Sequence, residues 1–214
     1  MKLQIAFDLF SSDDVLKALK ELHDLVDIIE IGTPLLLREG VQAVTKVKNK
    51  YPDFSVLADM KIIDGASVEA SMAFEAGADI VTVLAHAEEK TLEHVKNAAI
   101  KFKQKVMVDF ITIRDIQNTV QRLENHDLDY FCIHTAHDTT VDGKTPIDDL
   151  KRIHSLINVE KIAVAGGLNP DLLKTIQPYH PEIVVVGSFI TRAKRMRASA
   201  VTIKEMMGGI KEQR

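Results

Sequence analysis

Short apolar runs rich in valine and isoleucine recur along the whole sequence, and this repeat constrains the fold more than any other feature. The eight runs are residues 3–9, 26–31, 55–60, 80–84, 106–110, 130–133, 161–165 and 183–186. Runs of this length that are apolar at nearly every position are typical of strands buried on both faces, as in a parallel sheet. The sequence therefore predicts eight parallel strands.

Segments with helical periodicity lie between the runs. They are residues 12–25, 39–50, 67–75, 88–102, 115–123, 146–156 and 170–176, followed by a basic stretch after Thr191. Eight alternating strand and helix units in 214 residues predict an α/β protein with a single (β/α)8 TIM barrel, near the small end of its size range. We place this catalytic barrel domain at residues 1–207 and expect residues 208–214 to form a frayed C-terminal tail.

An open, doubly wound sheet is the alternative fold. Such sheets usually have fewer strands and carry a glycine fingerprint after the first one. Here the first run leads into Asp8-Leu9-Phe10-Ser11, without a glycine. The pattern therefore favours the barrel.

The composition is that of an ordinary globular protein, with 46% apolar and 27% charged residues. A formal net charge of −4 argues against nucleic acid or an acidic membrane surface as a partner. No run is long enough to cross a membrane, and the first residues enter a strand pattern without a signal-peptide core. The single cysteine, Cys132, lies inside an apolar run, so we expect a core residue and a reducing, cytoplasmic location.

Charged residues gather at the end of the third run, in Ala58-Asp59-Met60-Lys61-Ile62-Ile63-Asp64. Residues two apart on a strand face the same side, so we expect Asp59 and Lys61 to project together, with Asp64 a short step later. Ions in such a position need partners, because removing them from water is unfavourable. Taken alone, the cluster fits a structural ion-pair network as well as a catalytic site.

Polar residues at other strand ends favour the catalytic site. In (β/α)8 barrels the chemistry lies at the C-terminal ends of the strands. The residues at those ends are Asp8, Glu30, Asp59 with Lys61, Asp109 and His134. Charged groups at five strand ends would converge on one mouth of the barrel.

The residue types suggest roles. Glu30 lies within an apolar strand and needs a partner, and a hard cation shared with Asp59 is a suitable one. Two carboxylates suit Mg²⁺, which keeps water ligands and accepts substrate oxygens. His134 is a candidate for proton transfer near neutral pH, while Asp8 either caps the following loop or contacts substrate.

Glycines follow the last two runs. Gly166 and Gly167 come after the seventh run, and Gly187 and Ser188 after the eighth. Glycines at this place in a barrel let backbone N–H groups approach a phosphate, although they also serve tight turns. Their occurrence after both strands favours a phosphate site.

Together these motifs resemble those of the orotidine 5′-phosphate decarboxylase suprafamily. Asp59-x-Lys61-x-x-Asp64, with Asp8 ending the first strand, resembles its signature. Segments similar to its metal-dependent branch are Ile28-Ile29-Glu30-Ile31-Gly32-Thr33-Pro34, Leu57-Ala58-Asp59, Glu75-Ala76-Gly77-Ala78-Asp79 and Ala163-Val164-Ala165-Gly166-Gly167. That branch contains 3-hexulose-6-phosphate synthases and 3-keto-L-gulonate-6-phosphate decarboxylases.

The resemblance implies a homodimeric carbon–carbon lyase with Mg²⁺ held by Glu30 and Asp59. It also implies that Lys61 lies beside an enediolate, that Asp64 reaches the neighbouring subunit's site and that His134 transfers a proton. The implied reaction is the reversible aldol condensation of formaldehyde with D-ribulose 5-phosphate, giving 3-hexulose 6-phosphate.

Three positions favour this aldol reaction over the decarboxylase, which would release CO₂ and L-xylulose 5-phosphate. Asp109, His137 and Ala165 stand where the decarboxylase typically has Glu, Arg and Thr, and we count Asp109 among the catalytic residues. The chain departs from the usual synthase pattern at Ala136 and in the basic residues 192–197. The alternatives are the decarboxylase and, from another class, a ligand-binding barrel without catalysis.

Overall fold

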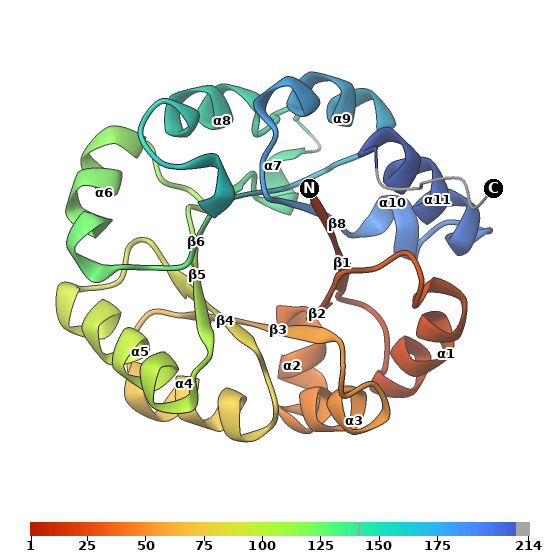
Figure 1. The fold of residues 1–214 in the computed structure, drawn as a ribbon, viewed down its shortest axis with the longest axis horizontal. Helices are drawn as coiled ribbons and strands as arrows, with labels where there is room; N and C mark the ends of the chain where they lie inside the picture. Colours follow the sequence, from red (N-terminus) through yellow and green to blue (C-terminus); the bar gives the residue numbers. More distant parts are fainter. Residues whose placement is uncertain (141, 209–214) are drawn as a thin grey trace.

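The computed structural model describes residues 1–140 and 142–208 and confirms the predicted barrel. Eight parallel strands form one closed sheet in which β1 pairs with both β2 and β8, and helices surround it (Figure 1). The strands are β1 Lys2–Phe7, β2 Ile28–Ile31, β3 Ser55–Ile62, β4 Ile80–Leu84, β5 Lys105–Asp109, β6 Tyr130–His134, β7 Ile162–Ala165 and β8 Ile183–Val186. Each predicted run overlaps one of them.

Most helices also lie where the periodicity predicts them. They are α1 Ser12–Leu22, α2 Thr33–Glu39, α3 Gln42–Lys50, α4 Ala66–Glu75, α5 Glu89–Phe102, α6 Ile116–Leu123, α7 His137–Thr140, α8 Ile147–His154, α9 Pro170–Ile176, α10 Ser188–Thr191 and α11 Met196–Met206, with 3-10 turns η1 Glu124–His126, η2 Val159–Lys161 and η3 Gln177–Tyr179. None of the helices in the described part of the chain combines the length and apolar character needed to cross a membrane.

The helix predicted over residues 39–50 is present as α3, but it begins three residues later, and the preceding helix α2 was not predicted. Gly40 has a φ of 65° and ends α2, and a separate helix, α3, begins at Gln42. Glycine adopts positive φ without the steric cost that a Cβ brings, so it separates the two helices. The start of α2 has a signal of its own, since Pro34 in its first turn is a favoured position for proline.

The domain boundary at residue 207 stays a prediction, and all of the predicted tail except Gly208 lies outside the described residues.

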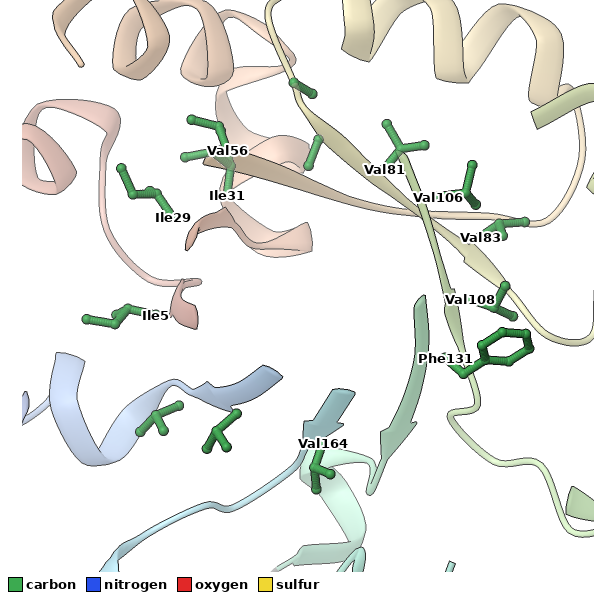
Figure 2. Close-up of a cluster of buried hydrophobic side chains, with 14 of the residues drawn as sticks. Ile5, Ile29, Ile31, Val56, Val81, Val83, Val106, Val108, Phe131 and Val164 are labelled. Carbon is green, nitrogen blue, oxygen red and sulfur yellow. The ribbon is translucent and has the colours of Figure 1, made fainter. Parts of the chain in front are cut away.

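Two apolar layers fill the molecule, because successive strand residues face opposite sides of the sheet. Outward-facing side chains such as Ile29, Val81 and Val108 pack in the layer between strands and helices (Figure 2). Inward-facing side chains fill the barrel: Ala6, Ile28, Leu57, Ile80, Met107, Tyr130, Cys132, Ala163, Ala165, Ile183 and Val185. Cys132 is therefore a core residue, as predicted, and the barrel interior is packed below its C-terminal mouth.

An ion pair from the basic residues 192–197, which follow β8, links the last helix to the first. Arg197 forms a two-pronged ion pair with Asp24, with both N–O distances at 2.6 Å. These hydrogen bonds lower the pKa of Asp24 to about 2. The pair is half-exposed, so it contributes little to stability, but it closes the ring of helices where α11 meets α1.

We predict that packing between α1 and the sheet carries much of the stability. Leu19 is fully buried, and Leu19→Ala is expected to lower the free energy of unfolding by about 2–5 kcal/mol, because it removes apolar contacts and leaves a cavity. Lys17→Ala, on the exposed side of the same helix, is the control and is expected to change it by less than about 0.5 kcal/mol. Urea-induced unfolding measures both. Equal effects of the two substitutions would contradict this packing.

Candidate active site

The C-terminal ends of the strands surround a cavity of about 480 Å³. Of the predicted site residues, those that line it are Asp8, Glu30, Asp59, Lys61, Asp109, His134, Gly166, Gly167, Gly187 and Ser188. Closure of a parallel sheet brings these strand ends, which are distant in sequence, into one ring. Asp64 is the exception, because it is exposed and does not line the cavity of its own chain.

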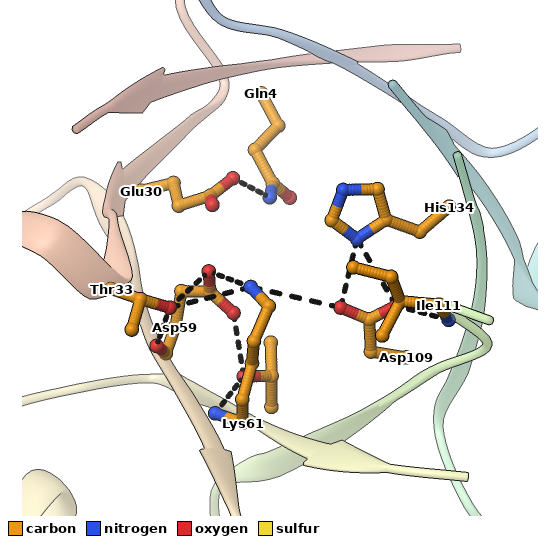
Figure 3. Close-up of polar contacts among 9 residues, drawn as sticks. Gln4, Glu30, Thr33, Asp59, Lys61, Asp109, Ile111 and His134 are labelled. Atoms are coloured by element: carbon orange, nitrogen blue, oxygen red, sulfur yellow. Dashed lines mark hydrogen bonds and ion pairs between the residues drawn. The ribbon is translucent and has the colours of Figure 1, made fainter. Parts of the chain in front are cut away.

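A connected series of polar contacts crosses this mouth (Figure 3). The Lys61 ammonium forms an ion pair with Asp59, and its Nζ lies 3.8 Å from Oδ2 of Asp109. Asp109 Oδ2 in turn lies 2.9 Å from Nδ1 of His134. Four of the predicted residues, from β3, β5 and β6, therefore form one network.

Asp59 and Lys61 meet through an irregularity in β3, not through the regular alternation that the sequence suggested. The pairing of β3 with β4 shifts between Ala58 and Ile62, with more residues on β3 than on β4. Lys61 has a φ of 46° within this bulge, a conformation that costs a non-glycine residue about 1–3 kcal/mol. The hydrogen bond from Lys61 N to Thr82 Oγ1, at 2.8 Å, helps to hold it.

Two threonines that the sequence analysis missed hold Asp59 in place. Thr82 donates from Oγ1 to Oδ1 of Asp59 at 2.8 Å. Thr33 Oγ1 lies 2.8 Å from Oδ2 of the same carboxylate and 3.3 Å from Nζ of Lys61. A signal for Thr82 was present, since it is the one polar residue in the apolar run of β4.

Burial and neighbouring charges shift the pKa values of these groups in different directions. Burial, reinforced by Asp59, raises the pKa of Glu30 to about 8, and the same causes raise the pKa of Asp8. Burial also opposes ionisation of Asp59. The charge of Lys61 and the hydrogen bonds that Asp59 accepts outweigh this effect and lower the pKa of Asp59. For Lys61, the charges of Asp59 and Asp109 outweigh burial and raise its pKa. The ion pair of Asp59 and Lys61 is thus stabilised, whereas Glu30 forms no ion pair within the described part of the chain.

His134 is oriented by Asp109. Both carboxylate oxygens of Asp109 lie within 3.1 Å of Nδ1, and the backbone N–H of Ile111 donates to Oδ1 at 2.8 Å. An ionised carboxylate can only accept hydrogen bonds, so the imidazole donates from Nδ1. The other ring nitrogen, Nε2, points away from Asp109 (Figure 3). In a neutral imidazole that donates from Nδ1, Nε2 is the hydrogen-bond acceptor.

Glycines make room for backbone and for Asp8 around the mouth. Gly166 has a φ of 103°, and a Cβ there would lie 2.4 Å from the carbonyl oxygen of Thr135. A Cβ on Gly32 would lie 2.1 Å from Oδ1 of Asp8. The wall after β7 is therefore built of backbone, and only glycine at position 32 leaves space for the Asp8 carboxylate.

The oxygen donors on β2 and β3 fit Mg²⁺. The side chains of Glu30 and Asp59 are buried and both line the cavity at the mouth, and the charge of Asp59 adds to the effect of burial in raising the pKa of Glu30. Across the described residues, no three His, Cys, Asp or Glu side chains come together as a complete metal cage. Two carboxylates with remaining positions for water and substrate are what Mg²⁺ takes in many enzymes.

Comparison with known proteins identifies the family. Residues 1–203 match the orotidine 5′-phosphate decarboxylase / HUMPS family. The chain belongs to this family. The predicted resemblance to the orotidine 5′-phosphate decarboxylase suprafamily is thus confirmed.

Its relatives in this family include synthases of similar length. A 3-hexulose-6-phosphate synthase from Bacillus subtilis is 36% identical over 207 residues, which cover 97% of this chain and 99% of the relative. The crystal structure of 3-hexulose-6-phosphate synthase from Salmonella typhimurium has a TM-score of 0.94 and 39% identity, covering 97% of this chain and 98% of that one. These names are those of a carbon–carbon lyase, so the chain is an enzyme of this kind, with an aldolase-type function.

A decarboxylase structure shows lower identity to the chain. The structure of 3-keto-L-gulonate-6-phosphate decarboxylase from Vibrio cholerae has a TM-score of 0.84 at 24% identity, covering 97% of each chain. At this identity the likeness shows the shared barrel and carries no argument about the reaction.

We predict that the contacts of Thr82 stabilise the site. Thr82→Val is expected to lower the free energy of unfolding by about 1–3 kcal/mol, because Asp59 loses a hydrogen bond and the backbone N–H of Lys61 loses its acceptor. Thr91→Val, at a buried threonine that does not line the cavity, is the matched control and is expected to have the smaller effect. Urea-induced unfolding compares them, and a Thr82→Val protein as stable as wild type would contradict the arrangement.

Proposed function

We propose that the chain is an Mg²⁺-dependent 3-hexulose-6-phosphate synthase, which adds formaldehyde to D-ribulose 5-phosphate in a reversible aldol reaction. The main support is the network of Asp59, Lys61, Asp109 and His134 at one barrel mouth, beside Glu30. The chain is also 36% and 39% identical to the two synthases over nearly its whole length.

Glu30 and Asp59 would hold the cation. When bound, Mg²⁺ supplies positive charge that stabilises negative charge on substrate oxygens. Glu30 is buried without a cation of its own, whereas Asp59 has Lys61, so a divalent ion would balance the charge of the site.

His134 and Lys61 would carry out the proton and charge chemistry. His134 Nε2 takes the proton from the sugar carbon next to the carbonyl group, and the electrons of that C–H bond form the enediolate. The Lys61 ammonium stabilises the negative charge on its oxygen. The same carbon then bonds to the carbon of formaldehyde, whose oxygen takes the proton back from the imidazolium. Asp109 keeps the imidazole in the required orientation throughout.

The phosphate group would bind on the side of β7 and β8. Gly166, Gly167, Gly187 and Ser188 place backbone along that side of the cavity. Arg192, from the basic segment after β8, lines the same cavity and adds positive charge. Backbone N–H groups after the last two strands are a common phosphate site in barrels of this kind.

We also propose a homodimer that works in the cytoplasm, without nucleic-acid or membrane partners. Ile63, Val68 and Met72 are 49%, 66% and 49% exposed and lie beside Asp64 along the chain, on α4 and the segment before it. An apolar patch next to a carboxylate that does not line its own cavity supports contact with a second copy. A reducing compartment suits a chain with one cysteine.

The purified protein is expected to consume formaldehyde in the presence of ribulose 5-phosphate and Mg²⁺, and to stop when excess EDTA removes the ion. Glu30→Gln and Asp59→Asn are expected to abolish the metal-dependent rate, because each removes a charged ligand. Asp13→Asn, at an exposed carboxylate on α1, is the control and should leave the rate unchanged. Formaldehyde loss measured over time checks all of these.

Other outcomes would point to the alternatives. CO₂ release from 3-keto-L-gulonate 6-phosphate, without formaldehyde consumption, would favour the decarboxylase. Binding of the sugar phosphate without turnover of either substrate would favour a barrel that only binds ligands. An EDTA-insensitive rate would contradict the metal.

A mixing experiment tests whether Asp64 completes the partner's site. Lys61→Ala and Asp64→Asn are each expected to lower the rate by at least about 100-fold. Mixed dimers of these two variants contain one intact site, so statistical subunit exchange should restore about one quarter of wild-type activity. A mixture of Lys61→Ala and Asp59→Asn is the control and should restore no activity. Both residues act in the site of their own subunit, so neither site of this mixed dimer is intact. Failure of the first pair to recover, with mixed dimers demonstrated by tag pull-down, would contradict the crossing of Asp64.

A further inference from the structure

Gln4 is a buried polar residue that neither the sequence motifs nor the proposed chemistry uses. It lies on β1, is 2% exposed and lines the cavity together with Ala6 of the same strand and Asp8, which comes directly after the strand. Its neighbours in register on the flanking strands are Ile28 of β2 and Val185 of β8, both apolar. An amide in such surroundings requires hydrogen-bond partners.

Its amide nitrogen has one partner, and that partner is Glu30. Gln4 Nε2 donates to Oε2 of Glu30 at 2.6 Å. When the carboxylate is ionised it only accepts, so the NH₂ group must face it and the amide oxygen must face elsewhere. Figure 3 shows the amide of Gln4 pointing into the ring of polar side chains, with its nitrogen toward Glu30.

The amide oxygen has no hydrogen-bond partner among the described residues. Among the buried side-chain nitrogen and oxygen atoms of the described residues, Oε1 of Gln4 is the one that lacks a hydrogen bond. It belongs to a residue that lines the cavity, and the side chains of its two register neighbours, Ile28 and Val185, have no hydrogen-bond donor. A molecule bound in the cavity is therefore a candidate source of the missing donor.

We propose that Gln4 is a positioning residue of the site, which holds the Glu30 carboxylate through Nε2 and accepts a hydrogen bond from an O–H group of the bound ligands through Oε1. This inference rests on the proposed function, which supplies two sources of such a group: a water molecule carried by Mg²⁺ and a hydroxyl of the sugar phosphate. Removal of a residue that orients a metal-binding carboxylate commonly weakens metal affinity by about 10- to 100-fold.

Gln4→Met tests this proposal, because methionine has a similar length and lacks both the donor and the acceptor. Isothermal titration with Mg²⁺ alone is expected to show affinity weakened by about 10- to 100-fold relative to wild type. Gln4→Asn, which keeps the amide but withdraws it by one methylene group, is expected to weaken it as well. Met107→Leu, another cavity-lining residue of the barrel interior, is the matched control and should bind Mg²⁺ as wild type does. Thermal melting shows that each variant is folded.

Kinetics at saturating Mg²⁺ distinguish the two sources of the O–H group. An unchanged KM for ribulose 5-phosphate in Gln4→Met assigns Oε1 to a water of the ion, whereas a KM raised by about 10-fold assigns it to a sugar hydroxyl. Wild-type affinity for Mg²⁺ together with wild-type KM in both Gln4 variants would overturn the proposal. Wild-type protein that binds no Mg²⁺ and consumes no formaldehyde would instead overturn the proposed function on which it rests.

Discussion

Closure of the sheet through the β1–β8 pairing is the constraint on which the rest of the structure depends. With Leu3 paired to Val184 and Ile5 to Val186, no strand is left at an edge, and helices cover the outer face of the whole sheet. Strands buried on both faces must be apolar at nearly every position, which is the pattern that the chain repeats. Closure also gives all inward-facing residues one shared interior, which is packed by apolar side chains except at its C-terminal mouth.

The mouth then has to accommodate several ionisable groups in a space with little water. Asp59 is stabilised by the Lys61 ammonium and by two threonine hydroxyls, so its charge is well compensated. Glu30 is also buried, but among the described residues its one side-chain hydrogen bond comes from the amide of Gln4. A barrel that stabilises one carboxylate and leaves its neighbour without a cation is suited to the additional positive charge of a divalent ion. The proposed Mg²⁺ site and the inferred part of Gln4 both follow from this imbalance.

Much of the fold and part of the site could be predicted because they depend on local pattern. Alternating apolar runs and helical segments specify eight units, and parallel strands place Asp8, Glu30, Asp109 and His134 at one end whatever their exact register. Prediction was less successful where one residue redirects the backbone. Periodicity did not predict α2, which Gly40 separates from α3, and it placed the start of the next helix three residues too early. The bulge around Lys61 brings this residue to Asp59 in a way that regular strand geometry does not describe.

Side-chain contacts between neighbouring strands could not be predicted from local sequence pattern. Gln4 meets Glu30 because β1 and β2 pair with Gln4 opposite Ile28 and Ala6 opposite Glu30, a register set by packing of the closed barrel. Thr82 reaches Asp59 for a similar reason, across the irregular pairing of β3 with β4. Sequence alone was enough for the kind of fold, its family and the residues that carry charge to the mouth, since hydrophobic periodicity and short motifs are local. The closed barrel was needed to establish which polar atoms meet there and which buried side-chain atom of the described residues has no hydrogen bond, since strand register depends on the packing of the whole chain.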